Sequence, residues 1–270
     1  MQVIDRRTFI ADLGRGAFAL AVVSVAACSP GTLASARPSS AQASASPHGS
    51  PPGGSEPSAT AAAGSPPSGN PPARDGLTWQ RVDLGFVSAY VLVRGGQAVV
   101  VDTGVGGTSG AIEDSLVAAG LDWSAVGHLI LTHRHNDHVG SAAEVMEAAP
   151  GAAAYAGAED ISAISVPRPL TPVGDGDRVF DLEIVTTPGH TPGSISVFDS
   201  VGGLLVAGDA LGTEGGRPTL PGARFTEDMD EAKRSIAKLG ELGFETLLVG
   251  HGDPIENGAS AAVAELAAQQ

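Results

Sequence analysis

The amino-acid sequence predicts an α/β fold in which two β-sheets pack face to face with helices on the outside. This prediction rests on two observations. Short β-rich segments form one group near residue 80 and a second group after residue 178, and each group is followed by segments of helical length. Such a pattern favours two sheets that bury one face against each other and the other face under helices.

A hairpin is the clearest feature of the first group. Residues 87–94 and 97–102 are rich in valine, and Gly95-Gly96 between them is typical of a tight turn. The other elements expected in this half are a strand at 79–84, a helix at 108–119, a strand at 126–132, a helix at 141–149, a strand at 153–156, a short helix near 159 and a loop at 167–172.

The second group repeats the β-rich start and then ends in helices. The elements expected here are strands at 178–187, 194–199 and 204–207, a helix at 227–242, a strand at 245–249 and a last helix at 257–268. Together the two groups define one folded region, residues 76–270, which is long enough to bury a core and is expected to be the catalytic domain.

The residues before this region predict an export signal and a tether. Arg6-Arg7 precede a short apolar run that ends in Val-Ala-Ala-Cys28. Residues 1–28 therefore resemble a twin-arginine signal with a bacterial lipobox, in which the cysteine is lipidated; a cleaved general secretory signal with an incidental cysteine is the alternative. Residues 29–75 are almost entirely Ser, Pro, Ala and Gly, which predicts a disordered tether.

These features predict an exported protein, held by a lipid at Cys28 on the outer face of the cytoplasmic membrane or in the cell envelope, or else secreted. Cys28 is the one cysteine, so an intrachain disulfide is excluded. The 30 acidic residues outnumber the 15 basic ones, and no basic stripe is present that could neutralise phosphates. A nucleic-acid partner is therefore not expected, and the oligomeric state is left open.

The strongest chemical signal is the segment 132–138, Thr-His-Arg-His-Asn-Asp-His, directly after a buried predicted strand. His133 and His135 are two residues apart and can face one metal ion, whereas the turn after them can direct Asp137 and His138 to a second ion. One loop can therefore serve two ions. The mixture of imidazole and carboxylate suits zinc, and also iron or manganese.

Three further candidate ligands stand at the ends of predicted strands and beside glycine: His190, Asp209 and His251. Glycine at such places lets the backbone turn sharply and come close to a metal cluster. His48 and His128 fall outside these motifs, and we interpret them as incidental or structural.

Taken in order, these motifs resemble those of the metallo-β-lactamase superfamily. The chain has Thr-His-x-His-x-Asp-His at 132–138, Pro-Gly-His-Thr-Pro-Gly at 188–193, Gly-Asp at 208–209 and Gly-His-Gly at 250–252, after an Asp-Thr-Gly at 102–104. The resemblance covers residues 77–270. It implies an αββα sandwich of two mixed β-sheets flanked by helices.

The resemblance also implies a role for each candidate ligand. The first metal ion would be held by His133, His135 and His190, the second by Asp137, His138 and His251, and Asp209 would bridge the two. Asp137 and Asp209 would be catalytic carboxylates as well as ligands. Asp102 would either hold the ligand loop through hydrogen bonds to backbone amides or only cap a turn.

The expected cofactors are two divalent metal ions, with zinc first and iron or manganese as alternatives. Two such ions about 3.5 to 4 Å apart can activate a water molecule and polarise a carbonyl group. The resemblance therefore implies a dinuclear hydrolase that uses a metal-bound hydroxide on a small-molecule substrate of the ester, thioester, lactone or amide type. A mononuclear iron oxidoreductase of the persulfide dioxygenase type, with the same fold and a similar histidine set, is the alternative, and a lipoprotein that only binds metal is a third hypothesis.

The sequence departs from two branches of this superfamily. No cysteine follows Cys28, unlike in the β-lactamases that use a cysteine ligand, and few residues follow His251, whereas the glutathione thioesterases carry an added helical domain. Residues 211–225 and 165–176 are expected to form substrate walls. Arg217 and Arg224 are interpreted either as contacts for a substrate carboxylate or as solvated loop arginines.

Overall fold

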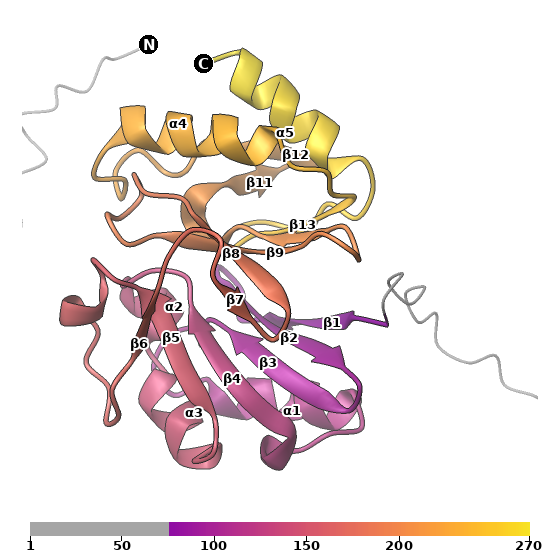
Figure 1. Ribbon diagram of the computed structural model, residues 1–270, viewed down its shortest axis with the longest axis vertical. Helices are drawn as coiled ribbons and strands as arrows, with labels where there is room; N and C mark the ends of the chain where they lie inside the picture. The colour runs from indigo at the N-terminus through magenta and orange to yellow at the C-terminus, as the bar shows by residue number, and fades with distance from the viewer. Residues whose placement is uncertain (1–75) are drawn as a thin grey trace, which may run out of the picture. The chain divides into compact units, whose positions relative to one another are not determined.

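The computed structural model describes residues 76–270. The signal at 1–28 with Cys28, the tether at 29–75 and His48 lie outside the described residues. In the described part, two sheets pack face to face and helices cover both outer sides (Figure 1). The α/β sandwich predicted from the sequence is confirmed. None of the helices in residues 76–270 has the length and apolar composition needed to cross a membrane.

The first sheet has six strands in the order β1-β2-β3-β4-β5-β6. β1, β2 and β3 pair antiparallel, whereas β3 to β6 pair parallel, so the sheet is mixed. Its strands are β1 (Thr78–Asp83), β2 (Ser88–Arg94), β3 (Gln97–Val101), β4 (Val126–Leu131), β5 (Ala153–Gly157) and β6 (Thr171–Val173). The helices of this half are α1 (Ser109–Ala118), α2 (Asn136–Val139) and α3 (Ala142–Ala148).

The second sheet has five strands in the order β13-β10-β9-β8-β7 and is also mixed, because only β10 and β13 pair parallel. Its strands are β7 (Arg178–Val179), β8 (Leu182–Thr186), β9 (Ile195–Asp199), β10 (Leu204–Val206) and β13 (Thr246–Leu248). A separate hairpin pairs β11 (Gly212–Glu214) with β12 (Arg217–Thr219). The helices α4 (Met229–Gly240) and α5 (Ala259–Ala268) belong to this half.

Alternating side chains divide the interior into three apolar layers. In β3, Val99 and Val101 point between the two sheets, whereas Val100 packs on the side of α1 and α3. In β10, Leu205 packs on the side of α4 and α5, while its neighbours Leu204 and Val206 join the central layer. Since successive residues of a strand face opposite sides, each sheet supplies two of these layers and the helices complete the outer ones.

Four local features differ from the sequence predictions. The expected loop at 167–172 is partly wrong, because β6 pairs with β5 from Thr171 onward; Pro172 is tolerated there because β6 is an edge strand. The single strand expected at 178–187 is a hairpin, turned by Phe180 and Asp181 with φ of 55° and 60°. The sequence analysis also missed α2, which has four residues, and the β11–β12 hairpin, whose strands have three residues each.

The candidate ligands follow strands whose carboxyl ends share an edge within each sheet. The loops after β3 and β4 leave the first sheet at one edge, since these strands are parallel. In the second sheet, β8 and β13 run in the same direction as β10, so the loops that carry His190, Asp209 and His251 also leave from one edge. The face-to-face packing of the sheets brings the two sets of loops together.

Close backbone contact between two loops predicts that a side chain at Gly140 would destabilise the fold. A Cβ at Gly140 would lie 2.4 Å from the Gly106 nitrogen and 2.7 Å from the Val105 carbonyl carbon, and the Gly140 N–H donates to the Gly104 carbonyl at 2.9 Å. We expect Gly140→Ala to lower the unfolding free energy by about 1–3 kcal/mol in urea titrations, because backbone atoms cannot move aside.

The matched control is Gly110 in α1, where an added Cβ meets nothing within 4 Å. Gly110→Ala is expected to raise the unfolding free energy by up to about 1 kcal/mol, because alanine loses less backbone entropy in a helix. Equal effects of the two substitutions would contradict the packing argument.

Candidate metal centre

The seven candidate ligands converge on one place. Three groups have ligand atoms that all lie within 4.8 Å of one another: His133 with His135 and His190, His133 with His138 and Asp209, and Asp137 with His138 and His251. The groups share members, so they form one continuous cluster. The geometry has the form that the sequence analysis expected, with a histidine group on one side and a mixed group on the other.

Asp209 lies at the middle of this cluster, on a 3-10 turn after β10. Its Oδ2 is 3.3 Å from His190 Nε2 and 3.2 Å from His251 Nε2, while its Oδ1 is 3.2 Å from His138 Nε2. The carboxylate is buried, with 8% of its surface exposed. One carboxylate therefore faces both groups.

Hydrogen bonds orient the buried histidines that follow β4. Asp102 accepts from the Thr132 amide at 2.7 Å, from the Thr132 hydroxyl at 2.7 Å and from His138 Nδ1 at 2.8 Å. Because the Thr132 hydroxyl donates to Asp102, it is free to accept from His133 Nδ1, 3.1 Å away. Asp102 therefore holds the ligand loop, as one of the two sequence interpretations proposed. It also contacts a ligand ring, which the sequence did not indicate.

Two histidines from the second half are oriented in the same way. His251 Nδ1 donates to the Phe86 carbonyl at 2.6 Å. His190 Nδ1 lies 3.2 Å from the Thr226 hydroxyl, which itself donates to the Gly222 carbonyl and so accepts from the ring. In four histidines, then, Nδ1 faces a hydrogen-bond acceptor outside the cluster and Nε2 faces the cluster, as in ligated imidazoles.

The positions of the ligand atoms fit bound metal ions, as two sets of contacts indicate. His138 Nε2 and Asp209 Oδ1 are buried and, although 3.2 Å apart, neither has a hydrogen-bond partner of good geometry among the described residues. His135 Nδ1 lies 3.1 Å from His133 Nε2 and 2.9 Å from His190 Nε2. Nitrogen and oxygen ligand atoms that converge in this way are stabilised by a shared cation.

The pKa values show where this cluster attracts positive charge. Burial lowers the pKa of His133 well below its usual value and that of His190 to about 4. Burial alone would also lower the pKa of His138, but the carboxylates of Asp209 and Asp102 raise it well above its usual value. The hydrogen bond with Asp137 and then that with Asp209 raise the pKa of His251 to about 10.

The two carboxylates respond in the opposite sense. Burial by itself would raise the pKa of Asp209, but His138 and other histidines lower it well below its usual value. The hydrogen bond with His251 lowers the pKa of Asp137. Both are therefore ionised at neutral pH, and the cluster favours positive charge, which protons or metal cations can supply.

Asp160 is a further residue of the site that the sequence analysis missed. It is fully buried, and its carboxylate accepts from the Arg134 amide at 2.9 Å, the Arg134 guanidinium at 2.6 Å, the Thr191 hydroxyl at 2.6 Å and the Gly193 amide at 3.1 Å. Arg134 stands between two candidate ligands, and Thr191 follows His190. One carboxylate thus joins the two loops that carry the histidine group.

We expect Asp160→Asn to weaken metal binding by about 10- to 100-fold, because an amide cannot accept all four hydrogen bonds and the loops lose their common anchor. A titration against a competing chelator, done where circular dichroism shows the variant folded, measures this. Asp175→Asn is the control, since Asp175 is an exposed carboxylate that pairs with Lys238 away from the cluster. Equal affinity in both variants would show that Asp160 has no positioning role.

A cavity of about 550 Å³ opens over the cluster. It is lined by Phe86, His135, Asn136, Asp137, His190, Asp209, Gly222, Phe225 and His251. The segment 211–225 therefore contributes to the wall as expected. The expectation for 165–176 is wrong, because none of its residues lines the cavity; part of that segment pairs with β5 as β6 instead. Arg217 and Arg224 are exposed and are not part of the lining.

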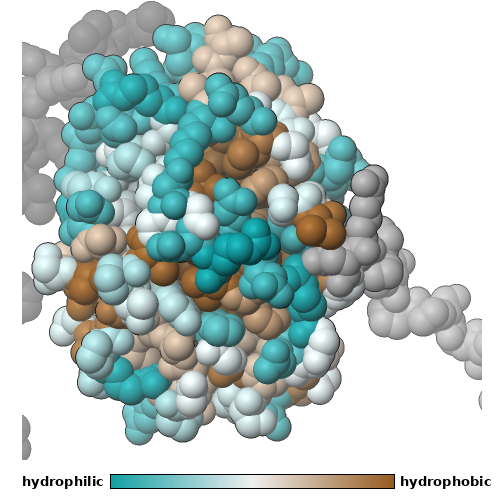
Figure 2. All heavy atoms as spheres, viewed as in Figure 1, coloured by the Kyte–Doolittle hydropathy of each residue, from teal (hydrophilic) through white to brown (hydrophobic). Residues whose placement is uncertain are grey.

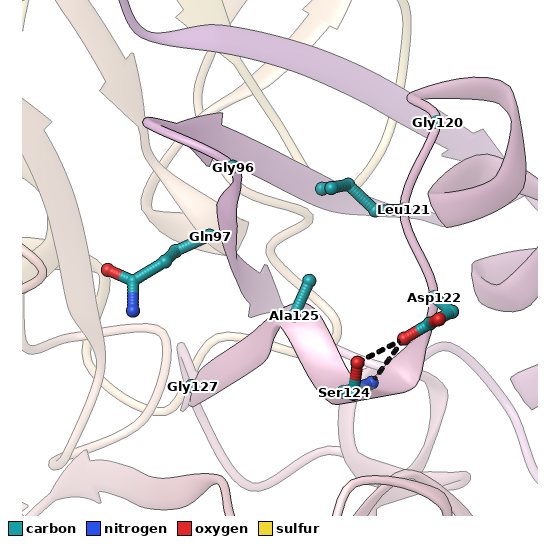
Figure 3. Close-up of a pocket in the computed structure, with 8 residues that line it drawn as sticks. All are labelled: Gly96, Gln97, Gly120, Leu121, Asp122, Ser124, Ala125 and Gly127. Carbon is teal, nitrogen blue, oxygen red and sulfur yellow. Dashed lines mark hydrogen bonds between the residues drawn. The ribbon is translucent and has the colours of Figure 1, made fainter.

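A second cavity, of about 420 Å³, lies near the turn between β2 and β3 and the segment that precedes β4 (Figure 3). Its lining contains a single carboxylate, Asp122, which accepts from the Ser124 amide at 2.8 Å and from the Ser124 hydroxyl. That lining has no histidine or cysteine and includes several glycines. Candidate metal ligands therefore line the first cavity and not this one.

Comparison with known proteins identifies the family. The sequence profile of the metallo-beta-lactamase superfamily matches residues 82–251, from β1 to the last candidate ligand. The chain belongs to the metallo-beta-lactamase superfamily. The αββα fold expected from the resemblance is confirmed, and histidine and aspartate groups of this superfamily member fit a metal site.

Relatives of the superfamily match most of the folded part. The probable metallo-hydrolase YflN of Bacillus subtilis is 31% identical over 58% of this chain and 76% of its own length. A hydroxyacylglutathione hydrolase of Erwinia tasmaniensis is 36% identical over 44% of this chain and 45% of its own length, so this chain spans under half of that relative. These names confirm the expected enzyme class, a metallo-hydrolase of the superfamily.

Solved structures of the superfamily agree with the fold. A metallo-beta-lactamase family protein from Thermus thermophilus superposes with a TM-score of 0.59 at 25% identity, covering 72% of this chain and 79% of its own. The B3 metallo-beta-lactamase BLEG-1 superposes with a TM-score of 0.56 at 22% identity, covering 66% of this chain and 93% of its own. The second likeness concerns the fold alone.

Proposed function

We propose that this protein is a dinuclear metal-dependent hydrolase of an ester, thioester, lactone or amide-type bond in a small molecule. One observation carries the proposal. The buried Asp209 presents one oxygen to His190 and His251 and the other to His138, so a single carboxylate faces two ligand groups at once.

The proposed assignment follows the two groups. The first cation would be held by His133, His135 and His190, the second by Asp137, His138 and His251, and Asp209 would be a ligand of both. When bound, a pair of divalent cations lowers the pKa of a water molecule and polarises a carbonyl group. Zinc is the proposed metal because tetrahedral sites rich in imidazole suit it, with iron or manganese as alternatives.

The residues of the chain then position the reactants. Asp102 and the Phe86 carbonyl hold the rings of His138 and His251, so their Nε2 atoms keep one orientation during turnover. Asp137 lines the cavity as an ionised carboxylate, with its Oδ2 3.4 Å from His251 Nε2. Asp137 would be primarily a ligand of the second cation, and as an ionised carboxylate in the cavity it would also be placed to accept a proton.

Elemental analysis of the purified protein tests the proposal. About two zinc ions per chain, together with hydrolysis of ester, lactone or cephalosporin substrates, would support it. One iron ion per chain with oxygen consumption would replace it by the dioxygenase alternative, which uses a similar histidine set. A protein that retains metal but turns over none of these substrates would contradict both enzymatic hypotheses and favour a metal-binding role.

We also propose that the protein is exported and tethered by a lipid at Cys28. The support is the Arg6-Arg7 pair and the Val-Ala-Ala-Cys sequence, which resemble an export signal and a lipobox. Partition of a bacterial membrane fraction in Triton X-114 is the measurement. The wild-type chain is expected in the detergent phase and Cys28→Ser in the aqueous phase; recovery of both in the aqueous phase would indicate simple cleavage.

A further inference from the structure

Two exposed aromatic rings stand at the same cavity. Among residues 76–270, the large apolar side chains that remain exposed are Phe86, Val117, Val201 and Phe225. Phe86 is 62% and Phe225 64% exposed, and both line the cavity over the metal centre, whereas the two valines do not. Figure 2 shows how apolar patches interrupt an otherwise largely hydrophilic face. Convergent exposed aromatic rings of this kind mark a place where an apolar ligand binds.

Each ring lies beside a different group of candidate ligands. Phe86 lies in the turn between β1 and β2, its carbonyl accepts from His251, and its ring stacks on the His251 ring with centroids 6.3 Å apart and planes 16° apart. Phe225 donates its amide to the Gly222 carbonyl at 2.9 Å, and its neighbour Thr226 contacts His190. The two walls therefore belong to the two ligand groups, and a substrate over the cluster lies between them.

The described cavity lining offers no lysine or arginine to an anionic group that lies away from the metal centre. Among the described residues that line it, none is Lys or Arg, and the charged ones include Asp137 and Asp209. Of the nearby arginines, Arg134 pairs with Asp160, and the Arg224 guanidinium lies over the Phe225 ring, 5.7 Å from its centroid, without lining the cavity. A carboxylate at the end of an acyl chain, remote from the bound cations, therefore meets no lysine or arginine of the described lining.

We propose that this site takes neutral acyl compounds, alkyl esters, thioesters or lactones, whose hydrocarbon chain lies between Phe86 and Phe225. The inference rests on the proposed hydrolase function and names its substrate class. The cavity volume of about 550 Å³ is in the range of small-molecule sites. A carboxylate at the end of the acyl chain is disfavoured by the same geometry, because it would lose its hydration against the two aromatic rings, away from the cations.

The test compares acyl chains on the metal-loaded wild-type protein. Its substrates are the p-nitrophenyl esters of acetate and hexanoate, the half-ester of adipate, γ-valerolactone and γ-nonalactone. Each buried methylene raises kcat/KM about fourfold at most, so we expect hexanoate to exceed acetate, and nonalactone to exceed valerolactone, by at least about tenfold. The adipate half-ester, which has the hexanoate length with a terminal carboxylate, is expected to fall to the acetate level or below.

Variants then assign the effect to the two rings. Phe225→Ala is expected to raise the KM for hexanoate about tenfold with little change in kcat, and to raise the KM for acetate far less. Phe86→Ala also removes a ring that stacks on His251, so its expected effect is on the ratio of kcat/KM for hexanoate to that for acetate, which should fall about tenfold. The control is Val201→Ala, which removes an exposed apolar side chain away from the cavity and is expected to leave both esters unchanged. Metal content and circular dichroism of each variant establish that the centre and fold are intact.

The failures of the two proposals are distinct. If acetate and valerolactone are hydrolysed but chain length has no effect, or if the adipate half-ester is preferred, the substrate class is wrong while the hydrolase function stands. If the chain-length preference persists in both phenylalanine variants, the rings are not the acyl walls. If the protein with two bound cations hydrolyses none of the esters or lactones, the proposed function falls and this inference falls with it.

Discussion

Replacing Asp209 with alanine is expected to abolish turnover while the fold survives. The side chain is the one that faces both ligand groups, so its loss removes a ligand from each cation at once. The cations contribute several kcal/mol to the transition state, and each 1.4 kcal/mol or so is a factor of ten, so kcat/KM should fall by at least about 10³-fold. His135→Ala is expected to act in the same direction by opening the histidine group.

The measurement combines kcat/KM, metal content per chain and circular dichroism. His128→Ala is the matched control, because His128 is a histidine on β4 that contacts the Tyr155 and Phe180 rings and is outside the cluster. It should keep two cations and activity of the wild-type order. Unchanged turnover in Asp209→Ala or His135→Ala would remove the dinuclear mechanism.

The second large effect is expected at Gly250, which donates its amide to the Gly208 carbonyl at 3.0 Å and whose own carbonyl accepts from the Ser88 amide at 2.9 Å. A Cβ here would lie 2.2 Å from Asp209 Oδ1 and 2.5 Å from His138 Cε1. Since the backbone is held on both sides, the methyl group would displace the two buried ligands. We expect Gly250→Ala to weaken binding of one cation by about 10- to 100-fold and to lower kcat accordingly.

Gly151→Ala supplies the control for this substitution, because an added Cβ there meets nothing within 4 Å and its φ is not in the left-handed region. Chelator competition gives the affinity of each cation, and thermal unfolding with metal removed separates a stability effect from a ligand effect. Tight binding of both cations by Gly250→Ala would mean that Asp209 and His138 have room to move, against the packing described above.

The seven candidate ligands were predictable because they occupy motifs whose spacing and glycines have chemical meaning. Asp160 had no such signal. It is one acid in Ala-Glu-Asp, and its importance comes from its hydrogen bonds with Arg134, Thr191 and Gly193. These residues lie 26 to 33 positions away from it in the sequence. The turn at Phe180 and Asp181 was missed for a related reason: neither residue is glycine, yet both adopt positive φ because the two paired strands require it.

The residues that line the cavity were also difficult to predict from the sequence. Residues 165–176 looked like a loop in the sequence because of their prolines, but the edge of the first sheet offered Thr171–Val173 a partner in β5. Phe86 and Phe225 carry no motif, and only their place beside His251 and Thr226 connects them with the cavity.

The sequence by itself determined the superfamily, the layered α/β fold and the set of candidate metal ligands, because strand periodicity, turn glycines and motif spacing are local properties of a chain. Only the tertiary structure decided which carboxylate faces both ligand groups, which backbone and side-chain groups orient each imidazole, and which apolar rings border the cavity. Those features depend on contacts between segments far apart in the chain, and such contacts exist only after the two sheets have packed against each other.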